Sequence, residues 1–287
     1  MKKTIGSALA AAAVVAGTTA VATTTATASP VPCAGAAPKA ISHVVVVFME
    51  NHSFNQIIGS SSAPYINTLA KSCGLATQYY GVTYPSLPNY LAVTSGSYYG
   101  IHDDNSPSSH PISAASIFSQ TPSWASLSES MPKNCDAANA YPYMVKHNPA
   151  PYYTNIKTQC ASKNIPLSST PSFAAAYTFV TPNMLHDMHD GTIAQGDSWL
   201  STFVPKVINS PQYQSGNTVL VITWDTDDRS SSNRAPALVI SPSVVPGTQS
   251  ATRSNHYSLL QLSEDLLGLP RLANAKTATS MRAAFHL

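Results

Sequence analysis

The chain contains 287 residues with a formal net charge of +2, and charged residues make up only 10% of it. So small a net charge argues against a nucleic-acid partner, and the low charged fraction implies a surface rich in uncharged polar residues. Beyond the N-terminus, no apolar stretch reaches the ~18 residues of a membrane-spanning helix. The remaining length suits one large α/β domain or two small ones.

The N-terminal residues have the pattern of an export signal. Lys2 and Lys3 precede a long stretch of Ala, Val, Gly and Thr, and the sequence ATAS would permit cleavage after Ala28. A membrane anchor is the alternative, but the many Thr and Ala residues make the stretch only mildly apolar. We therefore expect a secreted, extracellular protein. The expected organisation is a signal peptide over 1–28, a Pro/Ala-rich lead-in over 29–40 and a single domain over 41–287.

The first half of the domain mixes strand and helix patterns. The apolar run at 42–49 predicts a strand buried on both faces, since such a strand needs apolar side chains at every position. Helical spacing and terminal signals predict helices at 64–72 and 86–96, with Ser86 as N-cap of the second. The remaining expectations, in chain order, are a long loop over 101–123, a short helix over 122–130 and an irregular segment over 141–155.

The second half alternates more regularly. Strands are expected at 173–180, 217–224 and 235–241, and helices at 197–210 and 256–268. Because strands and helices alternate, we predict a mostly parallel sheet flanked by helices.

Four cysteines follow the expected signal, at positions 33, 73, 135 and 160. An even number in an exported chain predicts two disulfides, and three connectivities are possible. We favour Cys33–Cys73 and Cys135–Cys160 because these pairs close local loops. The absence of a C-x-x-C spacing argues against a zinc cluster.

Acidic residues follow two of the predicted strands. Glu50 and Asn51 end the first, and Asp225, Asp227 and Asp228 follow the strand at 217–224. Ligands of open α/β sheets gather beyond the carboxyl ends of the strands, and several buried carboxylates are costly unless a cation offsets them. A divalent metal bound by oxygen ligands would satisfy both clusters.

Simpler interpretations of these clusters stay open. Asn51 or Ser53 could cap the next helix in an ordinary polar turn. The acids after the second strand could form an exposed loop beside Arg229 and Arg234. A third cluster at 181–191, which could also be only a polar loop, offers more metal or catalytic candidates. They are Asn183, His186, Asp187, His189 and Asp190.

Ser86 is the candidate nucleophile. A helix N-terminus offers free N–H groups and a dipole that favour an anion such as phosphate, and a neighbouring metal would activate the hydroxyl. A plain capping role is the alternative. No G-x-S-x-G sequence occurs, which argues against an ordinary serine esterase. His256, at the start of its helix, becomes a candidate only if the clusters converge.

Four stretches match one family pattern in order: MENHSFNQIIG, YPSLPNYLAVTSG, TPNMLHDMHDG and VLVITWDTDD. With YMVKHNP at 143–149, they resemble the phosphoesterase family of bacterial acid phosphatases and C-type phospholipases, a branch of the alkaline phosphatase superfamily. The resemblance covers nearly the whole mature chain. It implies a three-layer α/β/α fold, a divalent metal of unknown identity and a Ser or Thr nucleophile that is transiently phosphorylated.

The resemblance also assigns roles to individual positions. Ser86 falls on the nucleophile, which also binds the metal, and Asn89 on an amide that holds a phosphoryl oxygen. His147 falls on a contact to the phosphate or leaving group. The positions on the first metal and phosphate ligands are Glu50, Asn51 and Asp225, and those near a second metal or the leaving group are Asn183, Asp187, His189 and His256.

One position departs from the family pattern. Family members usually follow the acid at 225 with another acid, and this chain has Thr226. Three outcomes are open: Thr226 ligates weakly, Asp227 substitutes for the missing acid, or the metal site is impaired. In every case we expect Glu50, Ser86 and Asp225 to lie around one point.

These features predict a secreted, metal-dependent, acid-phosphatase-like phosphomonoesterase that works through a phosphoserine. Its substrate would be a small phosphate ester or a lipid headgroup, and the protein is expected to be a monomer. One alternative is a phosphodiesterase of the phospholipase C type, although the chain is short for that class. The other is a non-catalytic binding protein on the same scaffold.

Overall fold

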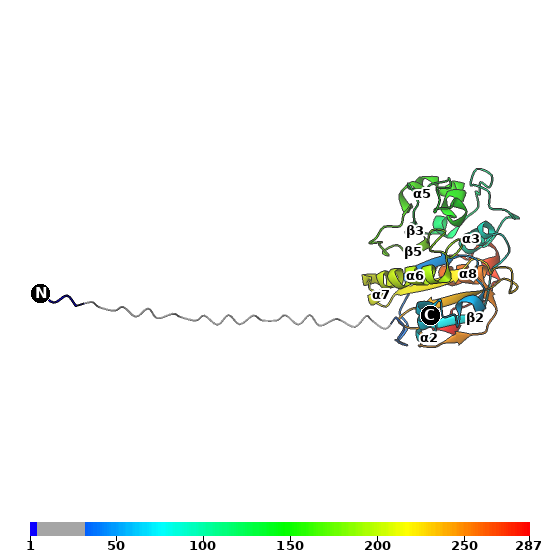
Figure 1. Cartoon of the computed structure of the whole chain (residues 1–287). Coiled ribbons are helices and arrows are strands. Elements are labelled where there is room, and N and C mark those ends of the chain that lie inside the picture. The colour runs from blue at the N-terminus through cyan, green and yellow to red at the C-terminus, as the bar shows by residue number, and fades with distance from the viewer. Residues whose placement is uncertain (5–31) are drawn as a thin grey trace.

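A nine-stranded sheet forms the centre of the computed structural model, which describes residues 1–4 and 32–287 (Figure 1). The expected signal peptide over 1–28 lies outside this part except for its first four residues, and so does the expected cleavage site after Ala28. Within the described ranges, no helix combines the length and apolarity needed to cross a membrane.

The strand order is β4-β3-β5-β1-β6-β7-β2-β8, with β9 also paired to β2. Among the described strands only β7 runs antiparallel to its neighbours. The strands are β1 His43–Met49, β2 Gly74–Tyr80, β3 Trp124–Ser128, β4 Asn164–Pro166, β5 Tyr177–Thr181, β6 Thr218–Trp224, β7 Arg234–Ile240, β8 Gln249–Ser250 and β9 Ser254–Asn255.

The central strand β1 lies between β5 and β6 and is parallel to both. Six of its seven residues are buried, as the continuous apolar run requires. The register places Met49 of β1 beside Trp224 of β6. Because the two strands end side by side, the next residues of each, Glu50 and Asp225, emerge at the same edge of the sheet.

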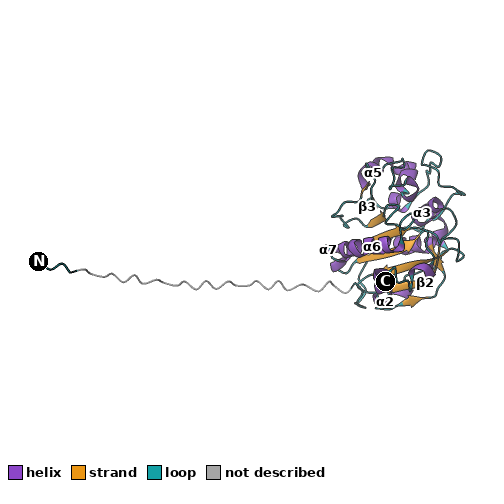
Figure 2. Ribbon diagram, in the orientation of Figure 1, coloured by secondary structure: helices purple, strands orange, loops and turns teal. Residues whose placement is uncertain are grey.

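Helices surround the strands in Figure 2, and the expected three-layer α/β/α architecture with a mostly parallel sheet is confirmed. Helix α3 packs against α8, and α2 packs against α6. The helices are α1 Phe54–Ile57, α2 Pro64–Ser72, α3 Ser86–Ser95, α4 Ile117–Gln120, α5 Lys157–Lys163, α6 Ile193–Ile208, α7 Pro211–Gln214 and α8 His256–Leu267. Short 3₁₀ turns are η1 Val145–His147, η2 Ala150–Tyr152, η3 Thr154–Ile156, η4 Ala273–Lys276 and η5 Ala283–Phe285.

The helix expected over 122–130 is wrong, because these residues contain the strand β3. Its residues pair in parallel with β5 on one side and β4 on the other, so sheet hydrogen bonding overrides the local helical pattern. Strand β2 was also missed. Helix α3 begins at Ser86 itself with Pro85 as N-cap, so the expected capping role of Ser86 is wrong as well.

Both favoured disulfides are present. Cys33 is bonded to Cys73 with a Cα–Cα distance of 5.2 Å, and Cys135 to Cys160 with 5.4 Å. The first attaches the lead-in to the end of α2. The second attaches the loop before η1 to α5.

Candidate active site

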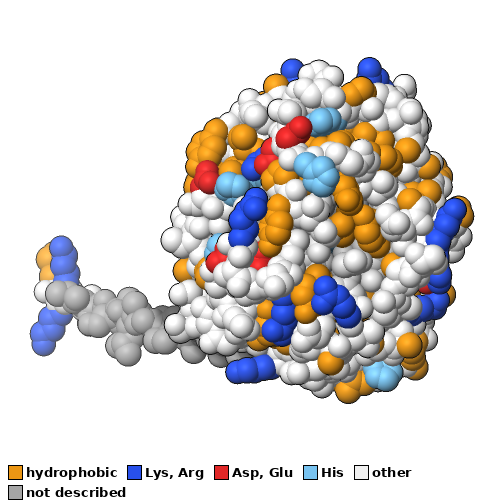
Figure 3. Space-filling view, turned by 90° about the vertical axis from the view of Figure 1, so that its right-hand side faces the viewer, with side chains coloured by type: hydrophobic (Ala, Val, Ile, Leu, Met, Phe, Trp, Pro, Cys, Tyr) orange, Lys and Arg blue, Asp and Glu red, His pale blue; other side chains and the backbone are white. Residues whose placement is uncertain are grey.

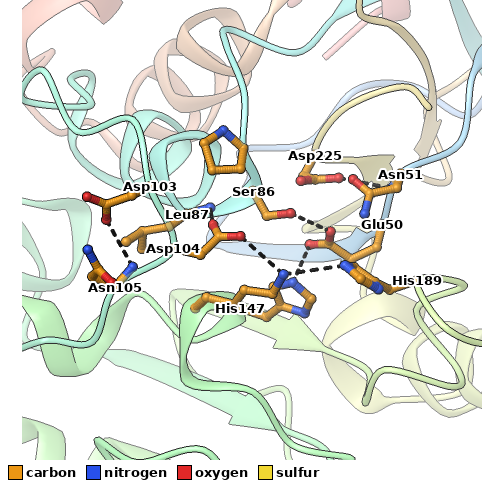
Figure 4. A network of polar contacts seen from close by, with 12 residues as sticks. Glu50, Asn51, Ser86, Leu87, Asp103, Asp104, Asn105, His147, His189 and Asp225 are labelled. Atoms are coloured by element: carbon orange, nitrogen blue, oxygen red, sulfur yellow. Dashed lines mark hydrogen bonds and ion pairs between the residues drawn. The ribbon is translucent and has the colours of Figure 1, made fainter. Parts of the chain in front are cut away.

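Ser86 is the first residue of α3 and is only 4% exposed. Its Oγ donates a hydrogen bond of 2.8 Å to Oε2 of Glu50, the residue that follows β1 (Figure 4). The next backbone N–H, that of Leu87, donates to Oδ1 of Asp104 at 3.0 Å. The start of α3 is therefore tied to both the sheet edge and the loop that contains Asp104.

Glu50 is fully buried and makes contacts on every side. Its Oε1 accepts a hydrogen bond from the Tyr90 hydroxyl and lies 3.2 Å from Nε2 of His147. Its backbone N–H donates to the carbonyl of Asp187 at 2.8 Å. Burial raises the pKa of Glu50 well above its ordinary value, and the nearby charges of Asp225 and Asp187 raise it further.

Asp225 occupies the matching position after β6 and is also fully buried. Its Oδ1 accepts from the backbone N–H of Asn51 at 3.0 Å, whereas its Oδ2 has no hydrogen-bond partner among the described residues. Thr226 donates through Oγ1 to Oδ1 of Asn51 at 2.7 Å. Burial raises the pKa of Asp225. An unpartnered carboxylate oxygen in this position is available to a ligand.

Two histidines and a third acid complete the cluster. His147 of η1 has Nδ1 3.1 Å from Oδ2 of Asp187, and the other oxygen of Asp187 accepts from the His189 backbone N–H at 2.8 Å. Burial lowers the pKa of His147 well below its ordinary value, and the charges of Lys146 and His189 add to this effect.

The donor set suits a divalent cation. One ligand atom from each of Glu50, His147 and His189 lies within 4.8 Å of the other two. His147 Nε2 makes no hydrogen bond among the described residues, although Glu50 lies near it. Neutral imidazole and carboxylate together bind divalent metals such as zinc. A cation would also offset the three buried acids.

A cavity of about 280 Å³ opens beside Ser86. Its lining contains acidic and basic side chains, and the basic ones other than histidine are Lys146 and Arg229. The complete lining is Asn51, Tyr84, Pro85, Ser86, Asp104, Lys146, His189, Thr226, Asp227, Asp228 and Arg229. Figure 3 shows a face of the molecule on which acidic, basic and histidine side chains gather within a largely uncharged surface.

The pattern of the Phosphoesterase family matches residues 60–270 of the sequence. The chain belongs to the phosphoesterase family. It is 35% identical to phosphatidylinositol-3-phosphatase of Mycobacterium tuberculosis over 260 residues, covering 86% of this chain and 85% of that protein. It is 26% identical to an acid phosphatase of Aspergillus fumigatus, covering 84% of this chain but only 58% of the fungal protein. Together these findings place the chain among hydrolases that act on phosphoric esters.

Solved structures agree with this family at the level of the fold. A protein of the alkaline phosphatase superfamily from Vibrio parahaemolyticus superimposes with a TM-score of 0.55 at 12% identity, covering 85% of this chain and 71% of that one. A lipoteichoic acid synthase from Listeria monocytogenes superimposes with a TM-score of 0.55 at 11% identity, covering 83% of this chain and 76% of that one. The expected alkaline-phosphatase-like fold is thus confirmed.

Asn89 does not reach the cavity of this phosphoesterase. It is fully buried, and its Oδ1 accepts from the backbone N–H groups of Val82 and Thr83 at 2.8 and 3.2 Å. Its Nδ2 donates to the carbonyls of Thr83 and Pro85 at 2.8 and 2.9 Å. The amide therefore holds the turn that leads into Ser86, and the structure does not bring it to a phosphoryl position.

Asp227 lines the cavity, but its carboxylate is already occupied. Oδ2 accepts from the backbone N–H groups of Ser231 and Asn233 at 2.6 and 3.0 Å. Oδ1 accepts from Arg229 N at 2.7 Å and from the Tyr84 hydroxyl. These bonds shape the loop between β6 and β7, and they leave little capacity for a metal.

His256 and Asn183 also lie outside the cavity lining. His256 is fully buried, with Nε2 2.6 Å from the backbone carbonyl of Asp225 and Nδ1 2.8 Å from the Tyr79 hydroxyl. Burial lowers its pKa to about 4, so it is neutral and supports Asp225 from behind. Asn183 accepts from the N–H groups of Leu185 and His186 and so shapes its own loop.

Three residues of the site were not predicted from the sequence: Tyr90, Asp104 and Lys146. Lys146 precedes His147 directly, so the YMVKHNP stretch contained a signal for it. Tyr90 lies one turn after Ser86 on α3, as its contact with Glu50 requires. Asp104 lies in the predicted long loop, and no local pattern distinguishes it from Asp103.

Proposed function

We propose that the protein is a secreted, metal-dependent phosphomonoesterase of the acid phosphatase type that works as a monomer. Residues 1–28 would direct its export and would then be removed. The observation that carries this proposal is the Ser86 hydroxyl, which lies at the start of a helix, beside a cavity, with a carboxylate 2.8 Å away. The phosphatase relatives support the same reaction class.

In the first step, Ser86 Oγ attacks the phosphorus atom and the ester P–O bond breaks. The hydroxyl proton has an acceptor in Oε2 of Glu50, to which it is already hydrogen-bonded. The departing oxygen takes a proton from solvent water, because both ring nitrogens of His189 in the cavity lining are already engaged. Water then cleaves the phosphoserine, which releases phosphate and restores the hydroxyl of Ser86.

The residues that would hold the metal are Glu50, His147, His189 and Asp225. The first three converge, and Asp225 has an oxygen without a partner among the described residues. When bound, a divalent cation would supply charge that offsets the phosphoryl oxygens. Thr226 stands where family members usually have a second acid, and its hydroxyl donates to Asn51. The other four donors do not depend on an acid at this position.

The direct test compares p-nitrophenyl phosphate with bis(p-nitrophenyl) phosphate while divalent metal ions are titrated into the chelator-treated protein. A phosphomonoesterase hydrolyses the monoester faster, and its rate rises with added metal. A faster diester reaction would indicate a phosphodiesterase instead. No turnover of either ester with any metal would support a binding protein.

A second measurement examines the covalent intermediate. When turnover is stopped by acid, peptide mass spectrometry should find one phosphoryl group on the peptide that contains Ser86.

Because the mycobacterial relative is named for a lipid phosphate, a 3-phosphorylated phosphatidylinositol and a soluble sugar phosphate should be compared as natural substrates.

A further inference from the structure

Lys146 lines the cavity and is held there by two neighbours. Its Nζ lies 3.2 Å from Oδ2 of Asp104 and 3.3 Å from Nε2 of His189, and its side chain is only 13% exposed. Nδ1 of His189 lies 2.7 Å from Oδ1 of Asp190. Until a cation binds, the imidazole therefore donates to Asp190 and accepts from the ammonium group, and a cation on His189 would leave the ammonium group with Asp104 alone. A lysine carries three N–H donors, and Asp104 and His189 are its two hydrogen-bond partners among the described residues, so at least one donor is left for a ligand in either state.

Asp104 connects this lysine to the nucleophile. Its Oδ2 contacts Lys146, and its Oδ1 accepts from the N–H of Leu87, the residue directly after Ser86. One carboxylate therefore fixes the ammonium group and the first turn of α3 relative to each other. Such a bridge keeps the cation at a constant place with respect to the attacking oxygen.

The remaining charges of the site are mostly negative. Glu50, Asp187 and Asp225 are buried beneath the cavity, and Asp227 and Asp228 line it. The other cationic lining residue, Arg229, has its guanidinium 4.5 Å from the centre of the Tyr84 ring. Lys146 is thus a fixed positive charge close to Ser86 in acidic surroundings.

The charge of the substrate decides how much such a cation contributes. A phosphomonoester has a second pKa of about 6 and carries nearly two negative charges at pH 7.5, whereas a diester carries one. A monoester also has one more non-bridging oxygen to contact a donor. A cation fixed beside the phosphoryl group therefore stabilises the monoester reaction more than the diester reaction.

We propose that Lys146, positioned by Asp104, contacts a non-bridging phosphoryl oxygen and gives the enzyme its preference for monoesters over diesters. The inference rests on the proposed phosphomonoesterase function and adds the residue that selects the substrate class. Lys146 is the specificity-determining residue, and Asp104 is a positioning residue that acts through it.

The experiment measures kcat/KM at pH 7.5 for p-nitrophenyl phosphate and its diester analogue, at saturating metal. Lys146→Met keeps an unbranched side chain that is one heavy atom shorter, and it removes the charge. It should lower the monoester value by about 10²-fold, as expected for loss of one donor to the transition state, and the diester value by less than about tenfold. Lys146→Arg should recover part of the monoester value, and Asp104→Asn should fall between wild type and Lys146→Met.

The matched control is Lys206→Met, an exposed lysine on α6, which should leave both values unchanged. A readout without turnover is calorimetric binding of inorganic phosphate and of dimethyl phosphate. Lys146→Met should weaken binding of the first far more than the second, and near-UV circular dichroism checks that each variant is folded.

Equal losses for both esters in Lys146→Met, or an unchanged ratio between them, would overturn the specificity role. If wild type hydrolyses the monoester but the ratio is independent of Lys146, only this inference fails. If wild type hydrolyses neither ester, the proposed function fails, and the phosphate-binding comparison still decides whether Lys146 contacts the anion.

Discussion

Asp225 and Asp227 are two residues apart on the same loop and are both buried, yet their surroundings differ completely. Asp227 accepts hydrogen bonds from three backbone N–H groups and a tyrosine hydroxyl. Asp225 keeps one oxygen without a partner in the described part of the chain. The first builds the loop, and the second remains available for chemistry.

The same division separates the other polar residues around the cavity. His147 and His189 converge with Glu50, to which Ser86 is hydrogen-bonded. By contrast, Asn89 bonds only backbone groups, and His256 bonds the Asp225 carbonyl and the Tyr79 hydroxyl. Residue type does not distinguish the two groups. Their hydrogen-bonding partners do, and variants can therefore separate loss of activity from loss of stability.

The largest effect is expected for Ser86→Ala. Turnover of p-nitrophenyl phosphate should fall by roughly 10³-fold or more, because no other side chain can form the covalent intermediate. The melting temperature should change little, since only the hydrogen bond to Glu50 is lost. Ser86→Thr, which keeps a hydroxyl, should retain part of the rate. An Ala variant with wild-type turnover would make directly activated water the better mechanism.

Removal of the metal should have the second-largest effect on turnover. Chelation should lower the rate by at least about tenfold and also lower the melting temperature, because Glu50, Asp187 and Asp225 are then buried without a cation. Returning a divalent ion should restore both quantities. A melting temperature that is independent of divalent ions, measured by differential scanning fluorimetry, would contradict the proposed ligand set.

The two acids of the loop provide a paired prediction. Asp225→Asn should reduce turnover strongly and leave the melting temperature of the metal-free protein equal or higher, since it removes one of several buried charges. Asp227→Asn should cost about 1–3 kcal/mol of stability through its weakened backbone contacts, with a smaller loss of turnover. The reverse pattern, with stability lost at 225 and activity at 227, would show that the two roles have been exchanged.

The effect expected to be smallest on turnover concerns Glu264 on α8, which should alter stability alone. Burial raises its pKa to about 8; Asp265 adds to the shift, while the Leu272 N–H and Arg271 oppose it. The unfolded chain releases this proton near pH 4.3, so the folded state binds more protons between these values. Stability should therefore fall as pH rises from about 4.5 to about 8.

Glu264→Gln removes this titration and is the matched variant. It should melt at a higher temperature than wild type at pH 9 and at nearly the same temperature at pH 5. Thermal unfolding across this range gives the comparison, and parallel curves for the two proteins would show that Glu264 does not titrate with a raised pKa.

Sequence alone predicted the elements whose pattern reflects burial on both faces. The apolar runs that became β1, β6 and β7 are examples, because a central strand has few alternatives. The strand β3 was mistaken for a helix, since its serines gave no continuous apolar run and its pairing with β5 lies about fifty residues away. Tertiary pairing of that kind leaves no local signal.

The site was predictable in position but not in detail. Two acids that directly follow strands, Glu50 and Asp225, indicated correctly at which edge of the sheet the site lies. The sequence could not show that the amide of Asn89 is used by its own turn, because that depends on four backbone groups brought together by the fold. Asp104 could not be predicted for a related reason, since its role depends on its contacts with the Leu87 N–H and the Lys146 ammonium group.

The position of β1 has a consequence for synthesis of the protein. It is the first strand of the described part of the chain, yet Val44 pairs with Tyr177 and His43 pairs with Thr218. At about 5–20 residues per second, a ribosome needs roughly ten seconds or more to reach the second partner. Throughout this delay a segment that ends up almost wholly buried has no strand to bind. An apolar segment that waits this long for its partners is exposed to aggregation while the chain is being made.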